Sequence, residues 1–141
     1  MRYLLDTMVL SEARKARADA RVVAWLEATA EDDLAISVLT LGAIERGVAR
    51  LEDASARDRL RTWLEADLRP RFGDRLLSVD AEVATAWGRI AGEASRLGRS
   101  VPAIDGLLVA TALRYGLTLV TRNTAHTRGL GVDVLDPWQR G

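Results

Sequence analysis

The sequence contains no cysteine and a single histidine, His126. The lack of cysteine excludes disulfide scaffolds, thiolate zinc sites and cysteine nucleophiles. A multi-histidine metal site or a Ser-His-Asp triad would have only His126 to draw on. If the protein binds a metal ion, oxygen atoms of acidic and amide side chains must therefore supply most of the ligands.

Long apolar runs are also absent. No stretch approaches the roughly 20 apolar residues that a membrane-spanning helix needs. The apolar run at the N-terminus reaches Asp6 too soon to form the core of a secretory signal peptide. We therefore expect a protein that works in the cytoplasm, away from membranes. Its 141 residues, 48% of them hydrophobic, are predicted to form one domain, residues 1–141, with a substantial core.

The sequence has no net charge, because twenty basic and twenty acidic residues cancel. This balance argues against a histone-like protein that binds nucleic acid through an overall positive charge. It does not exclude an enzyme that acts on RNA, because local charge differs from the total. Acidic residues outnumber basic ones up to residue 84, and basic residues outnumber acidic ones after it.

Hydrophobic periodicity predicts an alternation of short strands and helices. Strands are expected over residues 3–5, 34–37, 76–79, 117–121 and 132–135. Helices are expected over residues 20–30, 38–51, 54–69, 80–97 and 103–115, and another helix is expected after Asp6. Strands that alternate with helices are typical of an α/β fold, with a parallel sheet covered by helices on both faces.

A few residues mark the ends of these helices. Ser37 is a typical N-cap, and Gly98 and Gly116 are typical C-terminal stops. We expect Arg69-Pro70 to end the helix that precedes it, because proline disfavours helical dihedrals at the residue before it. These signals place most helix boundaries before any tertiary contact is considered.

The four tryptophans have two possible roles, base stacking on RNA or packing. Trp25, Trp63 and Trp87 each fall in an apolar helical stripe, which favours packing in the core or in a dimer. Trp138 follows Pro137 near the C-terminus and is predicted to close an edge of the sheet.

Three polar residues are predicted at or beside the carboxyl ends of strands, where ligands gather in open parallel sheets. Asp6 directly follows the first strand, Asn123 follows the strand at 117–121, and Asp105 stands in an otherwise apolar helix. Two carboxylates that converge in one crevice repel each other, and Mg²⁺ or Mn²⁺ relieves that repulsion. The structural alternative makes Asp6 a helix N-cap and Asp105 a first-turn acid that stabilises its helix. Either role is compatible with metal binding.

Blocks of sequence spread over nearly the whole chain occur in a recognisable order. They are Leu4-Leu5-Asp6-Thr7-Met8-Val9-Leu10-Ser11-Glu12, Ile36-Ser37-Val38-Leu39-Thr40-Leu41-Gly42 followed by Gly47, Pro102-Ala103-Ile104-Asp105-Gly106, Leu119-Val120-Thr121-Arg122-Asn123, Gly129-Leu130-Gly131-Val132 and Asp136-Pro137-Trp138. Each block alone is a weak signal. At this order and spacing the chain resembles PIN-domain ribonucleases, especially the VapC-type toxins of bacterial toxin–antitoxin systems in the FitB-like branch.

The resemblance implies a PIN-like three-layer α/β sandwich, in which a short parallel sheet is flanked by helices. It also implies a Mg²⁺- or Mn²⁺-dependent endoribonuclease that hydrolyses phosphodiester bonds of RNA, commonly tRNA or rRNA. The ion would lower the pKa of a bound water and stabilise the charge that builds on the phosphate. The implied partners are a VapB-type antitoxin, whose C-terminal segment wraps the domain, and a second copy of the chain. Together they would form a homodimer and, with the antitoxin, a heterotetramer or larger assembly.

Carried over by position, the resemblance makes Asp6 and Asp105 metal-ligating carboxylates. Asn123 takes the place of an acidic or amide residue that binds the ion directly or through water. Thr7 and Thr121 would support these ligands without touching the ion. Position 43 is expected to complete the catalytic set with a fourth side chain.

The sequence departs from the family at its second acidic position, where Ala43 replaces the expected glutamate. Glu45 is not expected to substitute, because residues two apart on a helix point about 200° away from each other. A natural loss would leave an inactive PIN domain that binds RNA or a partner. A deliberate change from glutamate to alanine would instead disable a toxic nuclease, and the intact remaining blocks favour this explanation. Both explanations make the chain inactive as it stands.

Basic residues near the predicted pocket offer contacts for RNA. His126 stands where relatives usually carry aspartate, and it is either a loop histidine without a catalytic role or a contact to RNA phosphate. Arg122 and Arg128 flank the predicted pocket and are further candidates for phosphate contacts. Met8 replaces a common asparagine, so one supporting hydrogen bond near Asp6 is expected to be absent.

Overall fold

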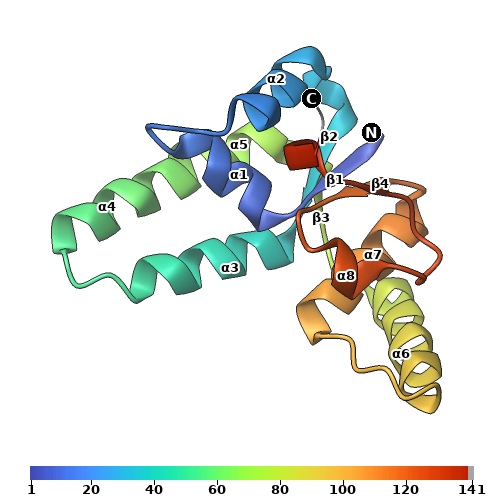
Figure 1. Ribbon diagram of the computed structural model, residues 1–141. Coiled ribbons are helices and arrows are strands. Elements are labelled where there is room, and N and C mark those ends of the chain that lie inside the picture. Colours follow the sequence, from blue (N-terminus) through green and yellow to red (C-terminus); the bar gives the residue numbers. More distant parts are fainter. Residues whose placement is uncertain (140–141) are drawn as a thin grey trace.

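A computed structural model describes residues 1–139 and shows a five-stranded sheet in which all neighbouring strands are parallel (Figure 1). The strands are β1 (Tyr3–Leu5), β2 (Leu34–Ser37), β3 (Leu76–Leu77), β4 (Thr118–Val120) and β5 (Val134–Leu135). Their spatial order is β3-β2-β1-β4-β5, so β1 is central. The predicted α/β class is confirmed, although β3, β4 and β5 are shorter than the sequence pattern indicated.

Eight helices of α type accompany the sheet within residues 1–139. They are α1 (Thr7–Arg14), α2 (Ala20–Ala28), α3 (Val38–Ala49), α4 (Ala54–Trp63), α5 (Arg69–Phe72), α6 (Ala81–Arg96), α7 (Ala103–Tyr115) and α8 (Thr124–Thr127). The expected caps are confirmed: the Ser37 hydroxyl accepts from the N–H of Leu39 at 3.0 Å, and Gly98 and Gly116 adopt φ of 77° and 67°. The short helix α8 was not predicted. None of the helices in this part of the chain is long and apolar enough to cross a membrane.

The helical segment that starts with α4 does not end at Arg69-Pro70, so that prediction was wrong. A π-helical turn, Leu64–Leu68, follows α4, and α5 carries Pro70 in its first turn. Proline is tolerated there because the first turn of a helix does not need its amide hydrogen. Arg69 keeps helical dihedrals, with φ of −60° and ψ of −48°. Burial of one face of the segment outweighs the local preference, and the buried side chains are Leu64, Leu68 and Phe72.

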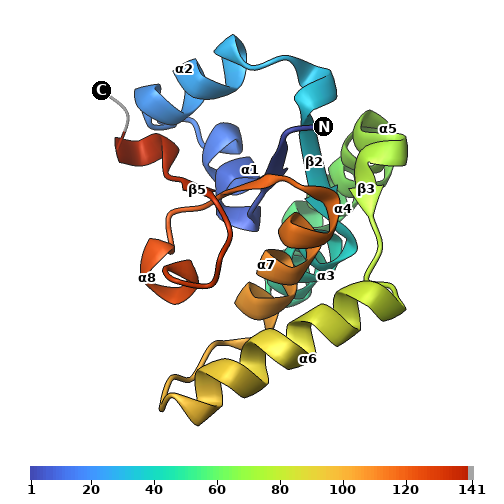
Figure 2. The same ribbon diagram turned by 90° about the vertical axis from the view of Figure 1, so that its right-hand side faces the viewer.

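The sheet separates two hydrophobic clusters, because successive side chains of a strand point to opposite faces. Leu5 and Val120 belong to a cluster that includes side chains of α1, α2 and α5. Leu4 and Leu119 belong to a second cluster that includes side chains of α7. Figures 1 and 2 show the same layering, with α6 lying along α7 on the second face. The three-layer arrangement expected from the resemblance is therefore confirmed.

The tryptophans pack within the chain. Trp25 and Trp138 are buried in the first cluster, where Trp25 meets Tyr3 edge to face with ring centroids 5.1 Å apart. Trp63 is half-buried against the same cluster. Trp87 is half-buried against α7 at Gly106, where an added Cβ would lie 2.9 Å from the indole. Trp138 follows the edge strand β5 and packs beside α2.

The central strand is expected to dominate stability. We expect Leu4→Ala to lower the free energy of unfolding by about 2–5 kcal/mol, because Leu4 has no exposed surface. Leu97→Ala is the matched control: Leu97 is 81% exposed, and its truncation is expected to change the free energy by less than about 0.5 kcal/mol. Urea denaturation followed by circular dichroism measures both variants. Equal destabilisation by the two changes would contradict this assignment of the core.

Candidate active site

The carboxylate of Asp6 lies at the carboxyl edge of the sheet, where β1 passes into α1. Its Oδ1 accepts the backbone N–H of Thr7 at 2.7 Å, and its Oδ2 accepts the hydroxyl of Thr121 at 2.7 Å. Leu5 pairs with Val120 across the parallel strands, so the residues that follow them become neighbours. Asp6 therefore caps α1, as its structural alternative predicted, and it also lies beside the end of β4.

Thr121 connects two of the predicted site residues. Its buried hydroxyl donates to Asp6 and accepts the backbone N–H of Asn123 at 3.0 Å. Asn123 is exposed at the start of α8, and its side chain does not cap that helix. The structure thus brings Asp6, Thr121 and the backbone of Asn123 into one hydrogen-bonded chain, while the Asn123 amide group remains at the surface.

Burial and hydrogen bonding act in opposite directions on the carboxyl group of Asp6. Burial raises the pKa of Asp6 above its ordinary value, and the hydrogen bonds from Thr121 and Thr7 oppose that rise by stabilising the ionised carboxylate. The negative charge of Asp105 raises the pKa of Asp6 as well. Asp105 stands in the first turn of α7, which contacts β1, so its charge acts on Asp6 from a neighbouring element. A divalent cation between them would remove the repulsion.

Asp105 projects from the first turn of α7 and is hydrogen-bonded to His126. His126 Nδ1 donates to Asp105 Oδ2 at 2.7 Å, and the Asp105 side chain is only 17% exposed. This pair was not predicted, because His126 was expected to be a loop histidine or a phosphate contact. The sequence carried one signal for it: a carboxylate in an apolar helix needs a polar partner when burial removes water.

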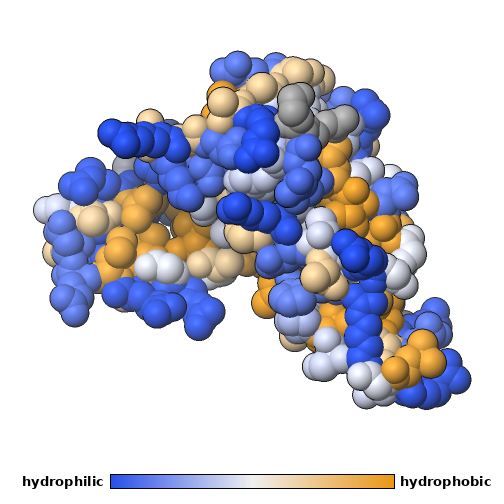
Figure 3. All heavy atoms as spheres, viewed as in Figure 1, coloured by the Kyte–Doolittle hydropathy of each residue, from blue (hydrophilic) through white to orange (hydrophobic). Residues whose placement is uncertain are grey.

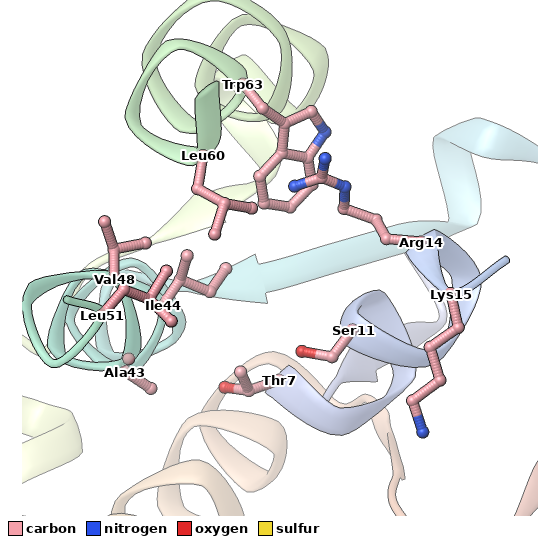
Figure 4. A pocket seen from close by; sticks show the side chains of 11 residues that line it. Thr7, Ser11, Arg14, Lys15, Ala43, Ile44, Val48, Leu51, Leu60 and Trp63 are labelled. Carbon is pink, nitrogen blue, oxygen red and sulfur yellow. The ribbon is translucent and has the colours of Figure 1, made fainter. Parts of the chain in front are cut away.

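Position 43 lies on the face of α3 that looks toward α1. Ala43 and Thr7 line the same groove, and Figure 4 shows them at one end of it. Glu45 instead binds Arg61 of α4, with Oε1 2.7 Å from Nη2, so it does not take the place of the carboxylate expected at position 43. Thr40 is buried one turn before Ala43, and its hydroxyl has no hydrogen-bond partner among residues 1–139. Buried hydroxyls rarely lack a partner, so the hydroxyl of Thr40 offers a hydrogen-bond site to a water or a ligand.

The groove that contains Ala43, here called the α1–α3 groove, has a volume of about 450 Å³. Figure 3 shows hydrophobic residues gathered in the hollow between α1, α3 and α4. Arg14 and Lys15 form a cationic rim, and the Arg14 guanidinium lies 4.1 Å from the centre of the Trp63 ring. The other lining residues are Thr7, Ser11, Ala43, Ile44, Gly47, Val48, Leu51 and Leu60. One end of the groove therefore contains Thr7, the residue that follows Asp6 in the chain, and the rest is mainly apolar.

Arg122 and Arg128 lie on either side of α8, and both side chains are exposed. The Arg122 guanidinium lies 5.2 Å from the centre of the Trp138 ring. The backbone oxygen of Arg128 accepts a hydrogen bond from Arg99. The two arginines thus flank the segment that carries Asn123 and His126, while their contacts to RNA stay predictions.

Comparison with known proteins identifies the family of this chain. The PIN domain family matches residues 3–129. The chain belongs to the PIN-domain family. Toxin FitB of Neisseria gonorrhoeae is 36% identical to it, and the match covers 96% of this chain and 97% of FitB. Plasmid stability protein StbB of Pseudomonas syringae pv. tomato is 33% identical, with 96% of this chain and 98% of StbB covered.

Solved structures of other PIN-domain proteins share the architecture. The crystal structure of FitAcB from Neisseria gonorrhoeae matches with a TM-score of 0.92 at 35% identity, covering 98% of this chain and 99% of that chain. The structure of FitAB bound to a DNA fragment matches with a TM-score of 0.91 at 33% identity, covering 99% and 97%. The resemblance to the FitB-like branch, inferred from the sequence blocks, is therefore confirmed.

Acidic side chains of this PIN domain do not gather into a metal-binding cluster within residues 1–139. Within residues 1–139, no group of three or more histidine, aspartate or glutamate side chains is placed to hold a metal ion. Asp6, Asp105 and Asn123 nevertheless offer the oxygen donors that Mg²⁺ or Mn²⁺ prefers. A third carboxylate is expected from position 43, where Ala43 presents only a methyl group.

The Thr121 hydroxyl is expected to control the ionisation of Asp6. Thr121→Val should raise the pKa of Asp6 further, because it removes a donor that stabilises the carboxylate. It also removes the acceptor of the Asn123 N–H, at a cost of about 1–3 kcal/mol in stability. An NMR pH titration of the Asp6 carboxyl carbon measures the change, with Thr121→Ser as the control that keeps the hydroxyl. The same titration midpoint in Thr121→Val and the parent would show that the hydrogen bond does not act on Asp6.

Proposed function

We propose that this chain is the toxin of a toxin–antitoxin system and descends from a Mg²⁺- or Mn²⁺-dependent endoribonuclease that hydrolyses phosphodiester bonds of tRNA or rRNA. The observation that carries the proposal is the carboxylate of Asp6 at the carboxyl edge of the sheet, with its two oxygens held by the N–H of Thr7 and the hydroxyl of Thr121. Membership of the PIN-domain family and similarity to toxin FitB and VapC ribonuclease Y4jK support it.

In the proposed site, Asp6, Asp105 and Asn123 would hold the ion. When bound, a divalent ion acidifies a coordinated water and compensates the charge that builds on the phosphate. The chain's own residues orient the ligands: Thr121 and the N–H of Thr7 fix both oxygens of Asp6, and His126 fixes Asp105. This geometry keeps the carboxylates in place before the substrate arrives, which lowers the reorganisation needed during reaction.

Arg122 and Arg128 are proposed to bind RNA phosphates beside the site. Both are exposed cations on the segment around α8, so they can approach the backbone of a single strand without burial. We propose that the main role of His126 is to bind Asp105, because its Nδ1 is already hydrogen-bonded to that carboxylate. A phosphate contact through the other ring nitrogen remains compatible with this geometry.

Ala43 is proposed to disable the site. The residue lines the groove beside Thr7, and the neighbouring Glu45 is bound to Arg61. A lost carboxylate removes one anionic ligand and weakens both the binding and the placement of a divalent ion. A deliberate change of glutamate to alanine explains why the rest of the site is intact. The second candidate function, favoured by Ala43 alone, is a naturally inactive PIN domain that binds RNA or a partner.

An antitoxin is the proposed protein partner. Similar solved structures include FitAB bound to an IR36 DNA fragment and VapBC2 from Rickettsia felis bound to a DNA fragment from their promoter. Another is VapBC-5 from Mycobacterium tuberculosis, a member of the VapBC family of toxin–antitoxin systems. We assign the α1–α3 groove to a segment of the antitoxin, because its apolar walls extend to Thr7, the residue that follows Asp6 in the chain. We further propose that residues 1–141 form one domain, that two copies form a homodimer, and that the assembly with antitoxin is a heterotetramer or larger and acts in the cytoplasm.

The proposal is tested with the purified Ala43→Glu protein and a pool of tRNA and rRNA. Cleavage is expected in Mg²⁺ or Mn²⁺, is expected to stop in EDTA, and is expected to return when excess Mn²⁺ is added. Single-stranded DNA is the comparison substrate for the preference for RNA. An Ala43→Glu protein that binds RNA but cuts none of it with either ion would favour the binding module over the nuclease.

A further inference from the structure

We propose that Arg99 is a positioning residue of the active site. Its guanidinium holds α8 in place, and α8 in turn holds His126 against Asp105 and keeps Asn123 beside Thr121. The effect on catalysis rests on the function proposed above, whereas the effect on α8 does not. Arg99 lies outside the sequence blocks that pointed to the family, and it touches none of the expected metal ligands.

The backbone of Arg99 is anchored at the end of α6. Gly98 adopts φ of 77°, and the N–H of Arg99 donates to the carbonyl of Ala94 at 2.8 Å. These are the marks of a Schellman cap, in which the residue after the glycine bonds back into the last turn. The side chain of Arg99 therefore starts from a fixed point between α6 and α7, which pack along each other.

The guanidinium of Arg99 donates to three backbone carbonyls at the far end of α8. Nη2 donates to His126 O at 3.1 Å and to Ala125 O at 3.3 Å, and Nη1 donates to Arg128 O. The last carbonyls of a helix have no partner within it, and a cation there is favourable. A helix as short as α8, with four residues, does not hold itself together in water and depends on such external contacts.

The segment that Arg99 holds carries two contacts of the site. His126 Nδ1 donates to Asp105 Oδ2 at 2.7 Å, and the N–H of Asn123 donates to Thr121 Oγ1 at 3.0 Å. Asp105 itself stands in the first turn of α7, shortly after Arg99 in the chain. The Arg99 guanidinium thus connects two segments. One leads into α7, which carries Asp105, and the other is α8, which carries His126.

The chemistry of arginine fits this task. Its planar fork has several donors in a fixed arrangement and can serve carbonyls in different directions at once, whereas a lysine ammonium is a compact, flexible charge. Because its donors are committed to backbone carbonyls, Arg99 is not expected to bind RNA phosphate. Its loss should therefore disturb the position of the ligands and leave the affinity for RNA unchanged.

The test compares Arg99→Ala and Arg99→Lys with Arg96→Ala, which removes an exposed arginine from the same end of α6. In the chain as it stands, hydrogen exchange of residues 124–130 is expected to speed up by about tenfold in Arg99→Ala, from the loss of hydrogen bonds at one segment. Arg99→Lys should lie between Arg99→Ala and the parent, and Arg96→Ala should match the parent. Unchanged exchange in Arg99→Ala would overturn the proposal.

The second arm uses the Ala43→Glu background. Arg99→Ala is expected to weaken Mn²⁺ binding by about 10-fold or more, as loss of an outer support of metal ligands does. It should also lower kcat for RNA cleavage with KM unchanged, and added methylguanidinium should restore part of kcat. Faster exchange at α8 with unchanged Mn²⁺ binding would limit Arg99 to a structural role and overturn its positioning role. If Ala43→Glu cuts no RNA, the proposed nuclease fails, while exchange and Mn²⁺ binding still decide the role of Arg99.

Discussion

Expression of the Ala43→Glu protein without an antitoxin is expected to arrest bacterial growth, whereas the chain as it stands is expected to be tolerated. The new carboxylate would join Asp6 and Asp105 as a third anionic ligand at the edge of the α1–α3 groove. We expect the rate of RNA cleavage to rise at least about 100-fold, because removal of one group that supports a metal ion or a transition state lowers activity on that scale. Glutamate and alanine differ by only a few tenths of a kcal/mol in helix propensity, roughly, so α3 should remain intact.

Two controls separate a restored ligand from an added side chain. Ala43→Gln has the size of glutamate without its charge and is expected to leave growth unaffected. Gly47→Glu places a carboxylate one turn further along the same groove, at a position where no atom beyond the adjacent residues and the backbone of α3 lies within 4 Å of an added Cβ. Growth arrest by Gly47→Glu alone would mean that any carboxylate in the groove suffices, which would contradict the specific role of position 43.

Asp6→Asn, made in the Ala43→Glu protein, is expected to lower RNA cleavage by at least about 100-fold. The amide still accepts the N–H of Thr7 and can donate to the oxygen of Thr121, so the local fold should survive. It lacks the negative charge that a divalent ion requires. Cleavage of labelled RNA in Mg²⁺ measures the loss, and an Asp6→Asn protein that cuts as fast as its parent would remove Asp6 from the proposed mechanism.

The same substitution makes a prediction about pH and stability. The pKa of Asp6 is raised in the folded state, so the folded protein favours the protonated carboxyl and its ionisation opposes folding. Protonated Asp6 therefore stabilises the folded state. This stabilisation is fully present below the ordinary pKa of aspartate and is lost as the pH rises through the raised pKa of Asp6. Asparagine at position 6 cannot ionise, so the Asp6→Asn protein should become increasingly more stable than its parent as the pH rises through the raised pKa of Asp6. The difference in stability should persist at neutral pH. Thermal unfolding of the metal-free proteins at pH 3.5 to 7.5 measures this difference, and an advantage that shrinks with rising pH would contradict it.

The sequence predicted the parallel α/β sheet and the position of Asp6 because both depend on local patterns. Alternating apolar segments define the strands, and the residue after a parallel strand necessarily lies at the carboxyl edge. The break at Pro70 was wrong because burial of Leu64, Leu68 and Phe72 on one face overrode a local preference. Tertiary packing, which no local pattern reports, decided that element.

The contacts around α8 could not be predicted from the sequence, for a different reason. His126 and Asp105 are 21 residues apart, and Arg99 reaches backbone carbonyls that have no side-chain signature at all. A polar residue in an apolar helix indicates that a polar partner is needed, but the identity of that partner depends on how α7 and α8 pack. The departure at Ala43, in contrast, was visible only in the sequence, because an alanine in a helix leaves no distortion to observe.

The central claim is that a carboxylate at position 43 completes a divalent metal site with Asp6 and Asp105. Titration of Mn²⁺ into four proteins, monitored by electron paramagnetic resonance, tests it most directly: the chain as it stands, Ala43→Glu, Ala43→Gln, and Ala43→Glu combined with Asp6→Asn. We predict that Ala43→Glu binds Mn²⁺ at least about tenfold more tightly than the other three, as a further oxygen ligand for a hard ion should produce. Equal Mn²⁺ affinity in all four proteins would contradict the claim.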